Sequence, residues 1–333
     1  MAVISPQEVI VSALRIGVLA YPGCFASEVF GVPDLLTMAT HIAGPDHVGY
    51  EVSIVSPRRR VAASGGTALA VSPLRDVDVL VVPGFELAPG LDVDAKLASL
   101  APEVAAIRSH ASAGNVVVSI CVGAFLLAQA GVLHGRRATT AWLFADELAR
   151  RCPAADVQPE RLVVTDTGVT TTAAFSAMYD FALELIREHS GARVARSTAR
   201  MALVDDARSS QTPYVDAHLL PRPGNEFSRR VMRRLDQNLV ARYDLGALAA
   251  DFNVSTRTLL RRFADETGQS PLDYLQASRV RRARHLLETT GRTVASISAA
   301  VGYQDAGTFA ALFTRHTGRR PSDYRAAFRR GPA

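Results

Sequence analysis

Hydrophobic residues in the first half of the chain come in short runs separated by more polar, helix-forming stretches. Each run is rich in β-branched residues and is bounded by turn residues, which is typical of buried strands. The predicted strands cover 15–21, 50–56, 76–83 and 115–120, and the stretches 26–41 and 94–112 have the composition of helices. This alternation predicts an α/β domain with a mainly parallel sheet sandwiched by helices.

A hairpin pattern and a final helix mark the end of this α/β domain. The segment 161–172 has the pattern of a β-hairpin, and 174–190 has helical composition with basic residues in its last turn. From 191 to 226, Pro, Ser, Gly and Asn replace any sustained periodicity. We therefore expect a first domain over residues 1–190 and a linker over 191–226.

The last hundred residues contain an internal repeat with an offset of 50 positions. The sequence FADETGQSPLDY at 263–274 recurs as FTRHTGRRPSDY at 313–324. Each copy ends a pair of short helices with one apolar face and a tight turn between them, as in a helix-turn-helix unit. We expect an all-α domain over 227–333 with two such units, at about 244–266 and 294–316, joined by a long helix.

Charge divides the chain at nearly the same place. Residues 1–226 contain 18 Lys and Arg against 23 Asp and Glu, whereas residues 227–333 contain 19 against 9. A basic segment attached to an acidic one indicates an anionic partner for the basic part, nucleic acid before membrane. Together with the helix-turn-helix pattern, this predicts binding to double-stranded DNA.

The most apolar run, VVVSICVGAFLLAQAGVL at 116–133, holds Cys121 between small residues. A membrane span is one interpretation, but the change from valines to Ala and Leu favours a strand, a turn and a helix. A nucleophile elbow needs small residues two positions to either side, and Ser119 and Gly123 meet that demand. The cysteine is then either activated at a helix N-terminus or a small buried hydrophobe.

The cellular setting follows from cysteine usage and from the motifs that the sequence lacks. Three cysteines, at 24, 121 and 152, are too few and too scattered for a disulfide framework. The N-terminal sequence has no signal-peptide pattern, and no metal-ligand spacing is found. We expect a cytoplasmic protein with no metal, no cofactor and no membrane association.

The motifs in both halves resemble known families. The duplicated G-x-x-P-x-x-Y and the connector ASRVRRARHLLETTGRTVASISAAVGY resemble the AraC/XylS-type DNA-binding domain, over about 228–330. The VVPG at 81–84, the elbow SICVGAFLLAQAGVLHGRRATTAW and Glu28 resemble the PfpI-type, class I glutamine-amidotransferase-like domain. The two resemblances cover nearly the whole chain. They imply a regulator in which an amidotransferase-like domain precedes an AraC-type domain.

The resemblance also implies what the elbow does. Catalytic members of the superfamily place a histidine about twenty residues after the cysteine, where this sequence has Ala141. Without that base the cysteine lacks the usual means of forming a thiolate, so we expect no catalysis. A ligand pocket is expected instead, suited to a cationic or amino-acid-like metabolite. Its candidate residues are Glu28, Gly84, Phe85, Cys121, Val122 and Trp142. Alternatively, Glu28 only supports the elbow and Trp142 belongs to the core.

We therefore expect a sequence-specific transcription regulator, most simply an activator. The expected partners are promoter DNA, a small-molecule effector, RNA polymerase and a second copy of the chain in a homodimer. Two alternatives stay open: an amidase- or hydrolase-like enzyme fused to a DNA-binding module, and a thiol redox switch in which Cys24 and Cys121 share a cleft.

The two predicted DNA-reading helices differ in their polar residues. In the first, Arg257 and Arg261 lie one turn apart and can reach guanine edges, with Leu260 beside them for a thymine methyl. The remaining candidates of this unit, Ser255, Thr256 and Arg262, suit phosphate contacts. The second helix has small residues at the matching positions. Its candidates are Asp305 and Thr308 for bases, and Arg315, Arg319 and Arg320 for phosphates.

Overall fold

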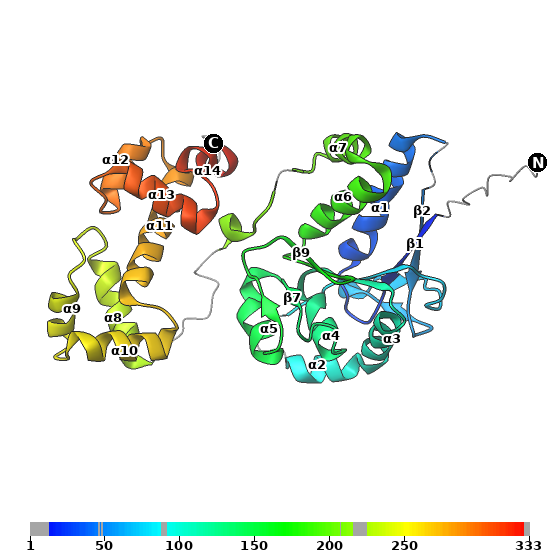
Figure 1. Ribbon diagram of the computed structural model, residues 1–333, viewed down its shortest axis with the longest axis horizontal. Helices are drawn as coiled ribbons and strands as arrows, with labels where there is room; N and C mark the ends of the chain where they lie inside the picture. The colour runs from blue at the N-terminus through cyan, green and yellow to red at the C-terminus, as the bar shows by residue number, and fades with distance from the viewer. Residues whose placement is uncertain are drawn as a thin grey trace, which may run out of the picture. The chain divides into compact units, whose positions relative to one another are not determined.

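A computed structural model describes residues 13–45, 47, 49–87, 92–206, 208–215 and 225–329. The chain divides into two compact units, Met1–Gln211 and Thr212–Ala333 (Figure 1). In the described part of the chain, no helix combines the length and the apolar character needed to cross a bilayer.

The first unit is built on a six-stranded sheet with the order β2-β1-β5-β6-β10-β9. All neighbouring strands are parallel except β10 and β9, which form the antiparallel hairpin expected from the sequence. The strands are β1 (Leu14–Leu19), β2 (Tyr50–Val55), β5 (Val79–Val82), β6 (Val116–Ser119), β9 (Val163–Asp166) and β10 (Val169–Thr172). Two short pairs flank the sheet: β3 (Val61–Ala62) with β4 (Ala68–Leu69), and β7 (Arg137–Ala138) with β8 (Asp156–Val157). The predicted α/β fold is therefore confirmed.

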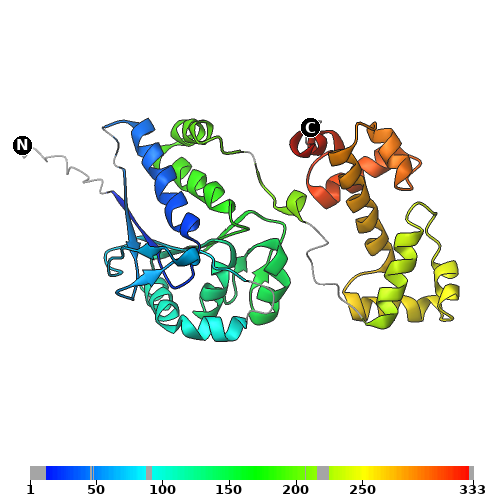
Figure 2. The ribbon, with the colours of Figure 1, turned by 180° about the vertical axis from the view of Figure 1, so that it is seen from behind.

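Helices cover both faces of this sheet (Figures 1 and 2). On one face lie α1 (Ala26–Ala43), α6 (Ala177–Ser190) and α7 (Ala192–Met201), which pack on one another. On the other lie α2 (Val93–Ser99), α3 (Ala101–Ser112), α4 (Ala124–Gln129) and α5 (Ala145–Arg151). The stretch 94–112 forms two helices because Pro102, favoured in a first helical turn, starts a new helix after Leu100.

Helix α7 lies inside the range 191–226, for which the sequence predicts a linker. Its buried side is made of Val194, Ala195, Thr198 and Ala199, which belong to or adjoin the main core. The arginines between these residues point to solvent, so the helix is polar on average although its two faces differ clearly. The compact first unit accordingly continues to Gln211.

The second unit is all-helical, as the sequence predicts. It begins with the 3₁₀ turn η4 (Thr212–Tyr214), and its helices are α8 (Glu226–Gln237), α9 (Leu245–Asp251), α10 (Thr256–Thr267), α11 (Pro271–Thr289), α12 (Val294–Ala300), α13 (Ala306–Thr317) and α14 (Pro321–Phe328). Two separate hydrophobic clusters form around Phe263 and Phe313. Each cluster is the core of one helix-turn-helix module: the first module contains α8–α10, the second contains α12–α14, and α11 runs between them (Figure 1).

A buried arginine on the connecting helix ties the two modules together. Arg279 of α11 donates from Nε to the carbonyl of Leu239, at 2.8 Å, and from Nη2 to that of Ala241, at 2.7 Å. Its guanidinium group also lies 5.1 Å from the centre of the Tyr303 ring, in the second module. A buried charge needs such partners, because leaving one unsatisfied costs about 1–3 kcal/mol or more. Arg279 is thus a structural contact between the modules, although the polar sequence of α11 does not indicate one.

Candidate regulatory site and nucleic-acid interface

The elbow forms where β6 ends and α4 begins. Cys121 opens a short 3₁₀ turn, η2 (Cys121–Gly123), and takes a left-handed backbone conformation with φ of 54°. A non-glycine residue rarely adopts this conformation, which is a feature of strained, functional turns. A Cβ atom on Gly123 would lie 2.5 Å from the carbonyl oxygen of Val82, so only glycine fits there. The predicted strand, turn and helix around Cys121 are confirmed.

Glu28 in the first turn of α1 is fully buried beside the elbow. Its Oε2 accepts a hydrogen bond of 2.5 Å from the backbone N–H of Gly84. Oε1 has no hydrogen-bond partner in the part of the chain that the structure describes. Burial raises the pKa of Glu28 to about 7, although the Gly84 N–H opposes this. The residue therefore holds a carboxyl group that changes its charge near neutral pH.

The close packing at Gly84 brings together three of the predicted pocket residues. A Cβ built on Gly84 would lie 3.2 Å from Cβ of Cys121 and 3.2 Å from Oε2 of Glu28. Two other predicted pocket residues, Phe85 and Val122, are buried in the hydrophobic core. Trp142 is half-buried in the turn η3 (Trp142–Phe144) and donates its backbone N–H to Gln211. The polar part of the site thus consists of Glu28, Cys121 and the Gly84 amide.

The thiol of Cys121 is not set up as a nucleophile. Burial, followed by the charge of Glu28, raises its pKa to about 12, despite the backbone N–H groups of Phe175 and Val122. At neutral pH the sulfur is therefore protonated, whereas attack requires the thiolate. The second cysteine of the predicted redox pair, Cys24, is also buried, and burial raises its pKa as well. Neither thiol has the exposed, electropositive setting of a redox-sensing cysteine.

The segment after the elbow helix passes directly beside Cys121. Thr140 donates its hydroxyl group to the carbonyl oxygen of Cys121 at 2.7 Å. The next residue is the buried Ala141, the position at which the sequence resemblance implies a histidine in catalytic members. Nothing at that position can take the thiol proton or protonate a leaving group.

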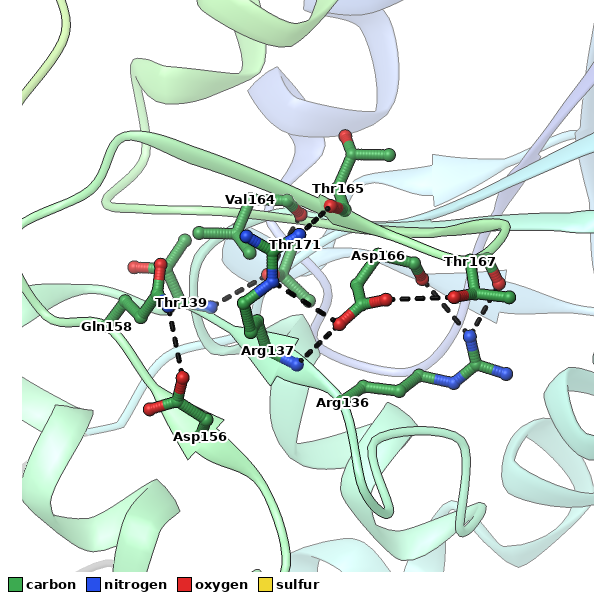
Figure 3. Close-up of polar contacts among 10 residues, drawn as sticks. All are labelled: Arg136, Arg137, Thr139, Asp156, Gln158, Val164, Thr165, Asp166, Thr167 and Thr171. Carbon is green, nitrogen blue, oxygen red and sulfur yellow. Dashed lines mark hydrogen bonds and ion pairs between the residues drawn. The ribbon is translucent and has the colours of Figure 1, made fainter.

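The β9–β10 hairpin holds this segment in place (Figure 3). The backbone N–H of Thr139 donates to the hydroxyl of Thr171 at 2.8 Å. Arg137 pairs with Asp166, whose carboxylate also accepts from the Arg137 backbone N–H at 2.9 Å. These contacts hold the backbone of residues 137–139 and so position Thr140 for its hydrogen bond with Cys121.

Phe175 is the site residue that sequence reasoning missed. Its backbone N–H hydrogen-bonds with the Cys121 thiol and so favours the thiolate, which opposes the effect of burial on the pKa. Its exposed ring packs edge-on against Phe25, with 5.7 Å between ring centres. It follows β10 and lies far from the elbow in sequence. No local pattern indicates that it adjoins the cysteine, because only the parallel pairing of β6 and β10 places the two strand ends together.

In the second unit, α10 presents the expected exposed face. Ser255 accepts a hydrogen bond from the Thr258 N–H at 3.2 Å and so caps the helix. Arg257 and Arg261 are exposed, and Arg261 lies 3.6 Å from Asp265. The other predicted residues on this helix, Thr256, Leu260 and Arg262, are exposed too.

Arg262 has a structural partner within its own module. Its guanidinium group lies 4.1 Å from the centre of the Phe227 ring, and Nε donates to Glu266 at 2.9 Å. This contact packs α10 against α8, so the arginine stabilises the module whether or not it also reaches a phosphate.

The corresponding face of α13 carries few groups that could read bases. Asp305 accepts hydrogen bonds from both the N–H and the hydroxyl of Thr308, at 2.6 and 2.7 Å, so these two candidates serve as a helix cap. Gly307 and Ala311 replace the arginines of α10 and are exposed. Ala310, Ala311 and Thr314 line a groove of about 470 Å³.

The three arginines proposed for phosphate contacts lie at the C-terminal side of this helix. Arg315 donates to Gln276 at 3.0 Å, and Arg319 lies 5.9 Å from the centre of the Phe328 ring. Arg320 is exposed at the start of α14. Their roles on DNA stay predictions.

Comparisons with known proteins agree with both halves of the molecule. A model of the DJ-1/PfpI family matches residues 25–188, and a model of a helix-turn-helix domain matches residues 248–327. The chain is a DJ-1/PfpI domain joined to an AraC-type helix-turn-helix domain. The resemblances expected from the elbow and from the repeat are thereby confirmed.

Similar curated proteins include two transcription factors. The HTH-type transcriptional activator RhaR of Yersinia pseudotuberculosis is 35% identical over 116 residues, which is 35% of this chain and 39% of RhaR. The HTH-type transcriptional regulator GbdR of Pseudomonas aeruginosa is 25% identical over 220 residues, which is 66% of this chain and 60% of GbdR. The chain thus spans less than two thirds of the length of both relatives.

Among solved structures, DJ-1beta of Drosophila melanogaster is similar with a TM-score of 0.47 and 22% identity, covering 58% of this chain and 99% of that one. An AraC family transcriptional regulator from Pseudomonas putida is similar with a TM-score of 0.47 and 19% identity, covering 57% of this chain and 99% of that one.

Proposed function

We propose that this protein is a sequence-specific transcription regulator whose helix-turn-helix modules bind promoter DNA. The exposed face of α10 carries the proposal. Arg257 has no hydrogen-bond or ion-pair partner within the described ranges, and Arg261 has only a long, exposed contact with Asp265. An arginine without a firm intramolecular partner is available for bidentate bonding to a guanine edge. The similarity to RhaR, a transcriptional activator, and to GbdR, a transcriptional regulator, supports the same function.

The two modules share the reading of DNA unequally in this proposal. The first module reads bases through Arg257, Leu260 and Arg261. The second binds through the shape of the duplex and its phosphates, because Gly307 and Ala311 offer no hydrogen-bonding side chain. The target then contains one well-defined block of bases and one degenerate block about one helical turn away, near 10 base pairs.

The DJ-1/PfpI domain senses a small effector without catalysis. The raised pKa of Cys121 and the methyl group of Ala141 both argue against turnover. The unbonded Oε1 of the buried Glu28 offers one hydrogen-bonding position to a nitrogen-containing or amino-acid-like ligand. The proposal further includes activation through RNA polymerase, a homodimer as the working form, and action in the cytoplasm.

Selection of bound duplexes from random DNA tests the DNA-binding part. The full chain is expected to return the one sharp and one degenerate block described above. Two equally sharp blocks would contradict the unequal division, and recovery of no preferred sequence would contradict sequence-specific binding. Mapping the bound sites across the genome would then point to the metabolite through the adjacent genes.

Substitutions at the elbow test the sensing part. A reporter gene driven by a bound site should keep its maximal activation in Cys121→Ala, because the thiol performs no chemistry. In Glu28→Gln the response to growth on different nitrogen compounds should change while DNA affinity in a binding assay does not. An unaltered response in Glu28→Gln would exclude Glu28 as a ligand contact. Steady amide, ester or aldehyde turnover that disappears in Cys121→Ala would overturn the absence of catalysis.

A further inference from the structure

The end of the first unit returns to the segment beside the elbow and is anchored there. Gln211 is almost fully buried, with 2% exposed. Its amide nitrogen donates to the carbonyl oxygens of Thr140, at 2.9 Å, and Pro159, at 2.7 Å, and Oε1 accepts from the Trp142 N–H at 3.0 Å. A buried amide with its donors and its acceptor satisfied is held in a single orientation. This Gln211 anchor therefore fixes the segment 140–142.

The anchored segment is one of two that contact Cys121. Thr140 donates its hydroxyl group to the carbonyl oxygen of Cys121 at 2.7 Å, and its own carbonyl group receives the Gln211 amide. Gln211 therefore sets how closely the segment 140–142 approaches the elbow.

Arg208 holds the other segment, at the start of α6. Its Nη1 donates to Oγ of Ser176 at 3.1 Å, and its Nη2 donates to the Ser176 carbonyl oxygen at 3.2 Å. The same guanidinium group pairs with Asp180, and the two side chains are only 13% and 9% exposed. A planar group with several donors holds such partners in a fixed geometry. Arg208 thus fixes the backbone directly after Phe175, whose N–H bonds to the Cys121 thiol.

The stretch between these two side chains is tied down as well. Ser210 forms an antiparallel bridge with Arg161. The hydroxyl of Ser210 and the backbone N–H of Gln211 both donate to the carbonyl oxygen of Glu160, at 2.7 and 3.0 Å. We call residues 208–211 the strap, because one short segment holds both of the segments that contact the cysteine.

We propose that the strap positions the two walls of the effector site and thereby controls access to the Cys121 elbow. Arg208 and Gln211 are positioning residues in this proposal, since they act on the elbow through Ser176 and Thr140. All of these groups belong to the first unit. The strap lies after the residues that match the DJ-1/PfpI family, so it is an addition to the family domain. The inference rests on the proposed sensing of an effector at the elbow.

The closed state of the site is visible at Cys121 itself, which is 8% exposed. Burial is the largest cause of the raised pKa of this thiol and keeps it protonated and unreactive. If the strap loosens, the two walls can separate, and water reaches the sulfur. The rate at which Cys121 is alkylated therefore measures how often the site opens.

Alkylation of the full chain by iodoacetamide in mildly alkaline buffer tests the strap, with peptide mass spectrometry following each cysteine separately. Gln211→Met keeps the length and bulk of the side chain but removes its donors and its acceptor. Cys121 should react about tenfold faster in this variant, because the hydrogen bonds of a buried amide are lost. Arg208→Lys keeps the charge but loses the planar fork, so a smaller increase, about threefold, is expected.

The chain offers controls for both variants. Cys24 is fully buried in the same hydrophobic core, and its rate reports general loosening of the fold. Gln129→Ala and Arg187→Ala remove an exposed glutamine and an exposed arginine of the same unit. Both control variants should keep the native alkylation rate at Cys121.

The pattern of rates decides the proposal. Faster alkylation of Cys121 alone, in either strap variant, supports the strap. An unchanged Cys121 rate in both variants overturns it, and so does equal acceleration of Cys24 in both, which would mean that the strap only stabilises the fold. Iodoacetamide reports opening without any effector. A failure of sensing, read separately in the reporter assay with Glu28→Gln, is therefore distinguishable from a failure of the strap.

Discussion

The two helix-turn-helix modules share one scaffold and differ on their outer faces. Each reading helix begins at a side-chain cap, Ser255 in one and Asp305 in the other, and ends at a glycine in the left-handed conformation, Gly268 or Gly318. A fully buried phenylalanine, Phe263 or Phe313, lies at the same position of each core. The tyrosines of the repeat also correspond, since Tyr274 donates to Asp236 and Tyr324 to Glu288.

The solvent-facing residues of the two reading helices do not correspond in this way. Arg257 and Arg261 on α10 are matched by Gly307 and Ala311 on α13. Packing and capping constrain the buried and terminal positions of a helix, whereas an exposed position is constrained only by what binds there. Under the proposed function this difference reflects what each module contacts, and each prediction below tests one part of it.

The largest loss of stability should come from substitutions in the hydrophobic core that the modules share, and it should be similar in both modules. Phe263→Ala and Phe313→Ala each leave a cavity under a reading helix and should cost about 3–5 kcal/mol of unfolding free energy. Denaturant unfolding followed by circular dichroism measures the loss. Leu260→Ala, at an exposed position, is the control and should change stability by less than about 0.5 kcal/mol. A phenylalanine whose removal is tolerated in one module alone would break the structural equivalence.

The outer faces should respond differently to exchange of their residues. Arg261→Ala should cost about 1–3 kcal/mol of specific binding and relax base preference in the well-defined block. The reverse change, Ala311→Arg, should sharpen the degenerate block. Selection from random DNA with each variant measures both effects, with Arg150→Ala on α5 as an arginine control. If Arg261→Ala leaves the preferred sequence unchanged, the first module does not read bases as proposed.

The two caps should differ in their dependence on pH. Ser255→Ala should cost about 1 kcal/mol of stability at any pH, because a hydroxyl cap does not titrate. The hydrogen bonds from Thr308 lower the pKa of Asp305. The contribution of Asp305 to stability is therefore complete above the pKa of Asp in the unfolded chain, about 4. It is lost as the pH falls through the lower pKa of the folded state. Asp305→Asn should keep the cap and remove this acid dependence, as unfolding measured on the acid side would show.

The smallest effect is expected for a phosphate contact in the second module. Arg319→Ala should weaken binding about equally across DNA sequences and reduce the slope of log affinity against log salt by about 1. Titrations at several salt concentrations, with preferred and unrelated duplexes, measure both quantities. A loss confined to the preferred duplex would mean that Arg319 reads bases, and the contrast between the modules would then be smaller than proposed.

Much of the fold and part of the site could be predicted from local sequence. The valine-rich run followed by Ala and Leu predicted the strand, turn and helix around Cys121, because secondary-structure preference and the need for small residues act within a few positions. Glu28 was found through its family motif. Phe175 and the Gln211 anchor could not be found in this way, since their partners are distant in sequence and no pattern within a few residues of either one indicates them.

The sequence by itself determined that the chain has an α/β part and a duplicated all-α part, because hydrophobic period and a constant offset of 50 positions are properties of the chain alone. Only the tertiary structure decided which polar residues carry structural contacts. Arg262 on Phe227, Arg279 between the modules and Arg284 on the turn at Pro213 all look like solvated charges in sequence. Their partners lie several helical turns or whole helices away along the chain, so only the folded chain brings them together; for Arg279, which is buried, the contact also offsets the cost of burying a charge.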